Sequence, residues 1–192
     1  MIKKKINLFL INRTDEFLSE YIAPYAERLN WLSGFSGSAG RALIYQKKAF
    51  IFVDGRYTLQ VREEVNQNLF QILELKNYFD FLKKNVSNNF VIGLDSNHHS
   101  VNEVNILRKL FNYNSTKEIV YFEKNPIDCL WKKQPLYPNK KIFLHKKKFT
   151  GEISSSKIDK IQLILKKRSI DYYILTSLES IAWLLNIRGN DV

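Results

Sequence analysis

Glycines recur at every third position from Gly34 to Gly40, and Ser36 and Ser38 lie between them. A loop of this kind could cradle a phosphate group or present a serine nucleophile. A dinucleotide-binding loop needs G-x-G-x-x-G between a strand and a helix, and a P-loop needs Gly-Lys-Ser/Thr. A nucleophile elbow needs a glycine where Ser36 stands. The run therefore predicts a tight turn between a helix and a strand. The glycines, including Gly37, allow the backbone conformations of such a turn, and both serines are expected to bond to their own backbone.

A second polar segment follows an apolar run that indicates a buried strand. Its residues are Asp54, Gly55, Arg56 and Tyr57. We expect Asp54 to cap the next helix by accepting backbone N–H groups near Tyr57. Arg56 could pair with a carboxylate or lie at the rim of a binding surface.

Residues that could bind a metal ion are few and badly spaced. His98 and His99 are adjacent, and neighbouring side chains in an extended segment point in opposite directions. No H-E-x-x-H or comparable ligand spacing occurs. Asp54 and Asp95 are expected to be isolated carboxylates at strand ends. The lone Cys129 is expected to be a small packing residue, so the sequence predicts no catalytic residue and no metal ligand.

The formal net charge of +11 raises the possibility of nucleic-acid binding. Lysine outnumbers arginine 22 to 8, and the lysines are mostly scattered in pairs. No zinc finger, KH loop or RNP strand is present, so we expect no nucleic-acid partner. No segment approaches the roughly 18 apolar residues of a membrane helix, and the first residues do not form a signal peptide. We therefore expect a cytoplasmic protein with no membrane partner.

The first 124 residues alternate between strand and helix patterns. We expect strands at 5–11, 42–45, 49–53, 70–75, 90–94 and 119–122. We expect helices at 25–32, 57–65 and 78–84, and one opened at Ser100 by a capping box with Glu103. The inner face of that helix is expected to carry Val101, Val104, Leu107 and Leu110. Such alternation is typical of an α/β domain with a mixed sheet.

Residues 125–192 contain fewer recognisable strand and helix patterns. A short helix at 125–131 precedes a proline-containing linker at 132–139 and an amphipathic helix at 154–168. The inner side of the latter is expected to hold Ile158, Ile161, Ile164 and Leu165. A strand is expected at 172–175, and Thr176 with Glu179 is expected to cap a helix at 177–185 that stops near Gly189. One strand cannot close a sheet, so we interpret this part as a linker and the incomplete beginning of a second domain.

Four blocks carry a family resemblance. They are AERLNWLSGFSGSAG at 26–40, VDGRYTLQVREEV at 53–65, NPIDCLW at 125–131 and SLESIAWLLNIRGNDV at 177–192. In this order they resemble the N-terminal region of the Xaa-Pro aminopeptidases (aminopeptidase P). The resemblance implies a creatinase-type α/β domain over 1–124, with a mixed sheet and helices on its faces. It also implies that 125–192 begins a second domain of the same kind.

The family hydrolyses peptides with two divalent metal ions, Mn²⁺ being expected, held by two Asp, one His and two Glu in a C-terminal pita-bread domain. No motif for these ligands occurs here, so the resemblance implies that the chain alone is inactive and that its partners are the missing catalytic domain and a second copy. Because the N-terminal domain of dimeric relatives can border a neighbour's active site, Trp31 and Arg56 become candidates for the rim of a peptide-substrate site. A free-standing creatinase-like module for binding or dimerisation is the alternative.

Overall fold

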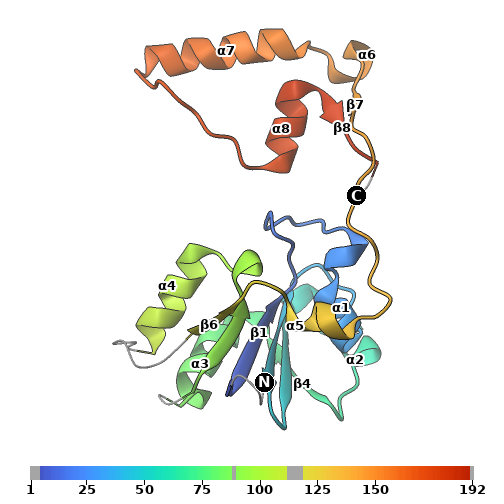
Figure 1. The fold of residues 1–192 in the computed structure, drawn as a ribbon, viewed down its shortest axis with the longest axis vertical. Coiled ribbons are helices and arrows are strands. Elements are labelled where there is room, and N and C mark those ends of the chain that lie inside the picture. Colours follow the sequence, from blue (N-terminus) through green and yellow to red (C-terminus); the bar gives the residue numbers. More distant parts are fainter. Residues whose placement is uncertain (1–4, 88–89, 112–118, 191–192) are drawn as a thin grey trace. The chain divides into compact units, whose positions relative to one another are not determined.

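The computed structural model describes residues 5–87, 90–111 and 119–190, and Figure 1 shows its fold. The chain divides into two compact units, Met1–Leu136 and Tyr137–Val192. The short helix after residue 124 therefore belongs to the first unit. The domain boundary expected after residue 124 stays a prediction. Residues 191 and 192, the end of the fourth resemblance block, lie outside the described residues.

A six-stranded sheet forms the centre of the first unit, in the order β4-β3-β2-β1-β5-β6. The strands are β1 (Leu8–Asn12), β2 (Gly40–Tyr45), β3 (Ala49–Val53), β4 (Phe70–Glu74), β5 (Ile92–Asp95) and β6 (Ile119–Phe122). Strand β2 runs antiparallel to both neighbours, with Leu43 opposite Leu10 and Phe50, and the other pairings are parallel. The predicted mixed sheet is confirmed.

Helices cover both faces of this sheet (Figure 1). Alternate strand residues point to opposite faces. Leu10 and Phe52 pack against α3 (Tyr78–Asn85) and α4 (Val101–Leu110). Phe9, Ile51 and their neighbours pack with α1 (Arg28–Ser33), α2 (Gln60–Glu64) and α5 (Pro126–Leu130). Short 3₁₀ turns precede several helices, at Pro24–Ala26, Gly55–Tyr57, Leu75–Asn77 and Ser96–His98.

Two predictions about α4 need correction. Val101 is 78% exposed and does not belong to the inner face, whereas Val104 and Leu107 are buried. Ser100 caps the helix by accepting the N–H of Glu103 at 3.1 Å. The Glu103 carboxylate does not bond back to Ser100, because it accepts from two side chains on neighbouring strands. The predicted capping box is therefore only half formed.

The second unit contains one two-stranded antiparallel sheet, made by β7 (Phe143–Leu144) and β8 (Ile187–Arg188). Three helices accompany it: α6 (Lys147–Thr150), α7 (Ser154–Lys167) and α8 (Leu178–Leu185). The strand expected at 172–175 is wrong, since these residues pair with no strand among those described. Regular strand structure needs a hydrogen-bonded neighbour, and a local apolar pattern does not provide one.

The ends of helices in the second unit also differ from expectation. Ser177, not Thr176, caps α8, because its hydroxyl accepts the N–H of Ser180. The helix ends at Asn186, which has φ 52°, rather than at Gly189. On α7, Ile164 is 52% exposed and lies outside the inner side. None of the helices among the described residues combines the length and apolar character that a membrane crossing requires.

Candidate functional site

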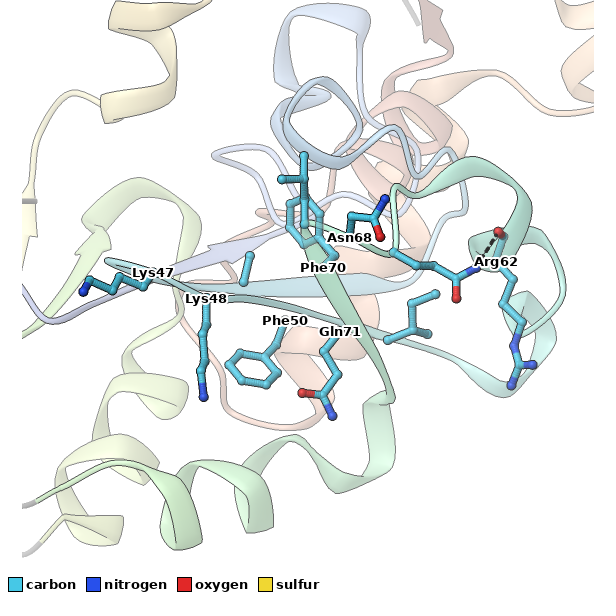
Figure 2. Close-up of a pocket in the computed structure, with 11 residues that line it drawn as sticks. Lys47, Lys48, Phe50, Arg62, Asn68, Phe70 and Gln71 are labelled. Carbon is cyan, nitrogen blue, oxygen red and sulfur yellow. Dashed lines mark hydrogen bonds between the residues drawn. The ribbon is translucent and has the colours of Figure 1, made fainter.

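A cavity of about 540 Å³ lies beside the start of β4, and its lining includes Lys47, Lys48 and Arg62. Three cations around one hollow could bind an anion. Figure 2 shows, however, that the three side chains extend in different directions and do not converge on one point. The cavity therefore lacks the geometry of an anion site.

The opposite end of the sheet collects most of the polar residues singled out in the sequence. Strands β1, β3 and β5 end there at Asn12, Val53 and Asp95, and the antiparallel β2 begins there at Gly40. We call this end the carboxyl edge. After β1 the chain continues to β2, on one side of β1 in the sheet. After β5 it continues to β6, which lies in the opposite direction along the sheet. In open α/β sheets such a switch in direction is the usual place for a ligand.

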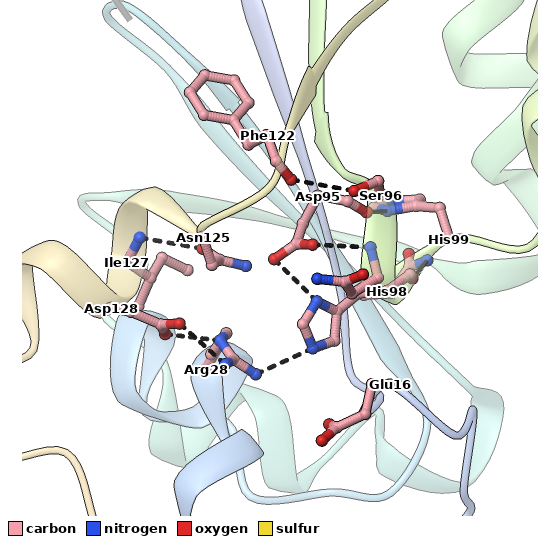
Figure 3. A network of polar contacts seen from close by, with 12 residues as sticks. Glu16, Arg28, Asp95, Ser96, His98, His99, Phe122, Asn125, Ile127 and Asp128 are labelled. Carbon is pink, nitrogen blue, oxygen red and sulfur yellow. Dashed lines mark hydrogen bonds and ion pairs between the residues drawn. The ribbon is translucent and has the colours of Figure 1, made fainter.

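A buried polar network occupies the carboxyl edge (Figure 3). His98 Nδ1 lies 2.8 Å from Asp95 Oδ2, and its Nε2 lies 3.1 Å from Arg28 Nη1. Arg28 donates from Nε and Nη2 to the two carboxylate oxygens of Asp128, at 2.7 and 3.0 Å. All four side chains are largely buried. The network thus joins the end of β5 to α1 and α5.

The contacts of His98 determine its tautomer. A guanidinium group can only donate hydrogen bonds, so Nε2 must accept from Arg28. The single ring proton of neutral His98 then lies on Nδ1, which faces Asp95. That N–H is close to the carboxylate but is not aligned well enough for a full hydrogen bond. His98 therefore connects the Asp95 carboxylate to the Arg28 guanidinium.

The sequence prediction of Asp95 as an isolated carboxylate is wrong. Burial alone would raise the pKa of Asp95, but contacts from His98, the Asn97 N–H and Asn125 outweigh burial and hold this pKa below its usual range. The adjacent His99 donates from Nδ1 to the Asp95 backbone oxygen at 2.9 Å. Burial lowers the pKa of His99. Both histidines are structural members of the edge.

The glycine-rich turn reaches the same edge. Gly34 has φ 84° and ends α1, donating its N–H to Asn30. A Cβ on Gly40 would lie 2.9 Å from the ring of Phe35, and one on Gly37 would lie still closer to that ring. Side chains therefore cannot be accommodated at Gly37 without displacing Phe35.

The serines of this turn do not bond to their own backbone, which corrects the sequence expectation. Ser36 donates its hydroxyl to Glu64 Oε1 at 2.6 Å. The hydroxyls of Ser38 and Tyr57 lie 2.6 Å apart, and this bond lowers the pKa of Tyr57. The turn is held by residues that follow it by 19 to 28 positions.

The Asp54 carboxylate accepts two hydrogen bonds from Arg56, one from the backbone N–H at 3.0 Å and one from the side-chain Nε at 2.8 Å. These bonds lower the pKa of Asp54. The Arg56 side chain is 68% exposed. Trp31 on α1 stacks on Trp131 with ring centroids 5.7 Å apart and remains 39% exposed. Trp31 and Arg56 are both accessible, and their substrate-rim roles stay predictions. Gly55 has no atom near the place of a Cβ.

The described side chains that could bind a metal ion are scattered over the chain. Within 5–87, 90–111 and 119–190, no three His, Cys, Asp or Glu side chains gather closely enough to hold a metal ion. Cys129 is exposed on α5, so its predicted packing role is wrong. The described donors do not fit a dinuclear centre.

Comparisons with known proteins agree with this fold. Residues 1–124 and 133–192 match two family models, both described as the creatinase/prolidase N-terminal domain. A probable Xaa-Pro aminopeptidase P from Coprinopsis cinerea is 31% identical over the whole chain, which covers 32% of that protein. A second, from Laccaria bicolor, is 32% identical, with 30% of its length covered. The chain thus spans about a third of the length of the curated relatives it matches.

A solved structure is similar over nearly the same range. The X-prolyl aminopeptidase of Caenorhabditis elegans, described as a cytosolic enzyme with a di-nuclear active site, superimposes with a TM-score of 0.86 at 27% identity. The superposition covers 97% of this chain and 31% of that enzyme. The resemblance seen in the four sequence blocks is confirmed, and the chain belongs to the creatinase/prolidase N-terminal domain family.

Proposed function

We propose that this chain is the non-catalytic N-terminal portion of an Xaa-Pro aminopeptidase, which releases the N-terminal residue that precedes a proline. The observation that carries the proposal is the continuous similarity of the whole chain to aminopeptidase P relatives about three times longer. The similarity to the di-nuclear C. elegans enzyme over both units supports it further.

The proposed enzyme takes its chemistry from outside this chain. Two divalent ions, Mn²⁺ by family resemblance, would activate a water molecule for attack on the peptide carbonyl. The described residues here hold no cluster of ligands for such ions. The role of this chain is therefore to shape the access of substrate to a catalytic domain that lies outside it. We propose that this enzyme is cytoplasmic and that it forms a homodimer.

Trp31 and Arg56 are the residues of this chain that we propose for the substrate rim. Trp31 presents a partly open indole, held in place by its stack on Trp131. Arg56 presents a guanidinium held by Asp54. An aromatic face and a fixed cation suit the ring and the carboxyl end of a short proline peptide.

A free-standing binding or dimerisation module is the alternative. One observation favours it: the first unit covers both faces of its sheet with its own helices. A domain that completes its own core does not depend on a catalytic partner for stability.

The test is an assay of the purified chain with an Xaa-Pro peptide and Mn²⁺, together with metal analysis of the protein. We expect no turnover and no stoichiometric metal. Turnover, or a tightly bound ion pair, would contradict the proposal. The reading frame after codon 192 separates the two candidates. Further coding with the Asp, Asp, His, Glu, Glu set supports the enzyme, and a stop codon supports the module.

A further inference from the structure

Strand β4 lies at one edge of the six-stranded sheet and pairs only with β3 among the described strands. The outer side of such a strand presents backbone N–H and C=O groups that no neighbouring strand uses. The cavity of about 540 Å³ lies at the start of β4. Its lining combines Phe50, on one face of the sheet, with Phe70 and Ile72, on the other. The cavity therefore follows the outer edge of the strand rather than lying over one face.

Hydrogen bonds show which backbone groups of β4 face outward. Phe70 N–H donates to the Asn66 oxygen in the preceding turn, so it does not point to β3. Backbone groups of successive strand residues point in opposite directions. Gln71 and Leu73 therefore bond to β3, and the N–H and C=O of Ile72 point away from the sheet.

The pairing of β3 with β2 leads to the same result. Tyr45 N–H donates to the Lys48 oxygen, so alternate residues from Lys48 onward point to β2 and Ile51 points to β4. Ile51 lies level with Ile72, and in a parallel pair it bonds to the residues on either side of Ile72. Ile72 is partly exposed, and its backbone groups have no partner among the described residues. They are available to an added strand.

Three exposed cations flank this edge: Lys47, Lys48 and Arg62. None of them forms an ion pair with a described residue. In the view of Figure 2, Lys47 and Lys48 lie on one side of β4 and Arg62 lies on the other. Side chains of an added strand also point alternately to two sides. Cations too dispersed for one compact anion therefore suit carboxylates at successive positions of an extended chain.

Two other occupants fit this edge less well. A single-stranded nucleic acid stacks its bases on exposed aromatic rings. Phe50 and Phe70, the aromatic residues of the lining, are both buried. A second copy of this chain would bring a further net charge of +11, which opposes association. An acidic partner meets neither obstacle.

We propose that the outer edge of β4 binds an extended acidic segment of a partner protein as an added strand. The segment pairs with the N–H and C=O of Ile72, and two successive carboxylates approach Lys48 and Arg62. Leu69, which is 65% exposed just before the strand, supplies apolar contact. In strand addition, main-chain hydrogen bonds supply affinity and side chains supply specificity. This inference goes beyond the proposed function and does not depend on it.

The probe is the acetylated peptide amide Val-Thr-Glu-Glu-Val-Thr, titrated into the isotopically labelled chain and followed by ¹H–¹⁵N NMR. We expect saturable shifts of the amides of residues 69–72. Hydrogen exchange should become slower at Ile72 but not at Leu73, whose N–H already bonds to β3. The matched peptide with Gln-Gln in place of Glu-Glu should bind at least about threefold more weakly, because it forms no ion pairs.

Variants test the contacts one at a time. Lys48→Gln and Arg62→Gln each remove one exposed cation, and each should weaken binding of the acidic peptide about twofold while leaving the neutral peptide unaffected. Ile72→Pro removes an N–H that takes no part in the pairing with β3, and it should weaken binding of both peptides about tenfold or more. Lys124→Gln is the control, since Lys124 follows β6 at the opposite edge of the sheet, and it should leave binding unchanged.

Three results would overturn the proposal. The first is the absence of saturable shifts up to the solubility limit of the acidic peptide. The second is equal or tighter binding of the neutral peptide or of a single-stranded oligothymidylate at the same amides. The third is saturation without slower exchange at Ile72, which would place the peptide in the cavity but outside the sheet. Thermal unfolding shows whether each variant is folded, and the two charge variants test the proposal even where Ile72→Pro is not.

Discussion

Arg28 and Asp128 are 100 positions apart in the chain, yet they form a two-pronged ion pair in the interior of the first unit. Gln134 completes the pair by donating to Asp128 Oδ1 and to the Tyr25 backbone oxygen. This arrangement ties the segment that leads out of the first unit to α1. The exit of the chain from the sheet is thereby held by polar contacts as well as by apolar packing.

Replacing Arg28 alone should be strongly destabilising. Arg28→Met leaves the largely buried Asp128 carboxylate without its charged partner and the His98 Nε2 without its donor. We expect a loss of about 3–5 kcal/mol in the free energy of unfolding, measured by urea denaturation. The double variant Arg28→Met/Asp128→Leu removes the uncompensated charge and should recover at least half of this loss. Equal stability of the single and double variants would contradict the role of the pair.

Gly34 and Gly37 in the glycine-rich turn should tolerate alanine much less well than Gly55 does. Gly34→Ala meets a positive φ and a Cβ position 2.8 Å from the Glu64 oxygen. We expect a loss of about 2 kcal/mol or more. Gly37→Ala clashes with Phe35 and should cost about 1–3 kcal/mol. Gly55→Ala is the matched control, because open space surrounds its Cβ position. Its stability should change by about 0.5 kcal/mol at most.

Acidification should lower stability in two steps. The folded state lowers the pKa of His99 through burial, so it favours the neutral ring. This contribution is full above the unfolded pKa, near 6.5, and is lost as the pH falls through the lower folded-state value. His99→Asn retains an N–H donor for the Asp95 oxygen and does not titrate. It should remove this first step in thermal unfolding measured from pH 7 to pH 5, and an unchanged profile would contradict the assignment.

The second step belongs to Asp95. Its pKa is also lowered in the folded state, so its stabilisation is present above the unfolded value of about 3.8 and is lost as the pH falls through the folded-state value. Asp95→Asn should therefore reduce stability at neutral pH and flatten the curve below pH 4. The same thermal series measures it. A variant that loses stability equally at all pH values would contradict this view.

Asn186 should not tolerate glycine, although its backbone conformation favours that residue. Its φ of 52° favours glycine, but its side chain accepts from Lys157 Nζ at 2.7 Å and donates to the Glu152 oxygen at 2.8 Å. Because Lys157 is almost fully buried, we expect Asn186→Gly to destabilise the second unit by about 1–3 kcal/mol. Hydrogen exchange in α7 and α8 measures the change.

Ser169 provides the matched control for this prediction. Its φ is 54° and its side chain is exposed. Ser169→Gly should leave hydrogen exchange in the second unit unchanged or slow it slightly. The corresponding gain in the free energy of unfolding is at most about 1 kcal/mol. Similar effects of the two glycine variants would show that backbone conformation, not the Lys157 contact, determines the role of Asn186.

The sequence by itself determined the features that short-range chemistry controls. The β2–β3 hairpin, the end of α1 at Gly34 and the cap of α4 at Ser100 each depend on residues within a few positions of one another. Apolar runs between these signals predicted the mixed sheet, because each strand must bury at least one face. The four resemblance blocks identified the family for the same reason, since each is a continuous local segment.

Tertiary structure alone decided which polar groups meet. His98 and Arg28 are 70 positions apart, and Ser36 and Glu64 are 28 apart. No local pattern connects such pairs, so the sequence described Asp95 as isolated and the serines as bonded to their own backbone. The strand expected at 172–175 failed because a strand requires a partner that its own residues cannot supply. Hydrogen-bond partners are chosen by the spatial meeting of strand ends, and only the folded sheet brings those ends together.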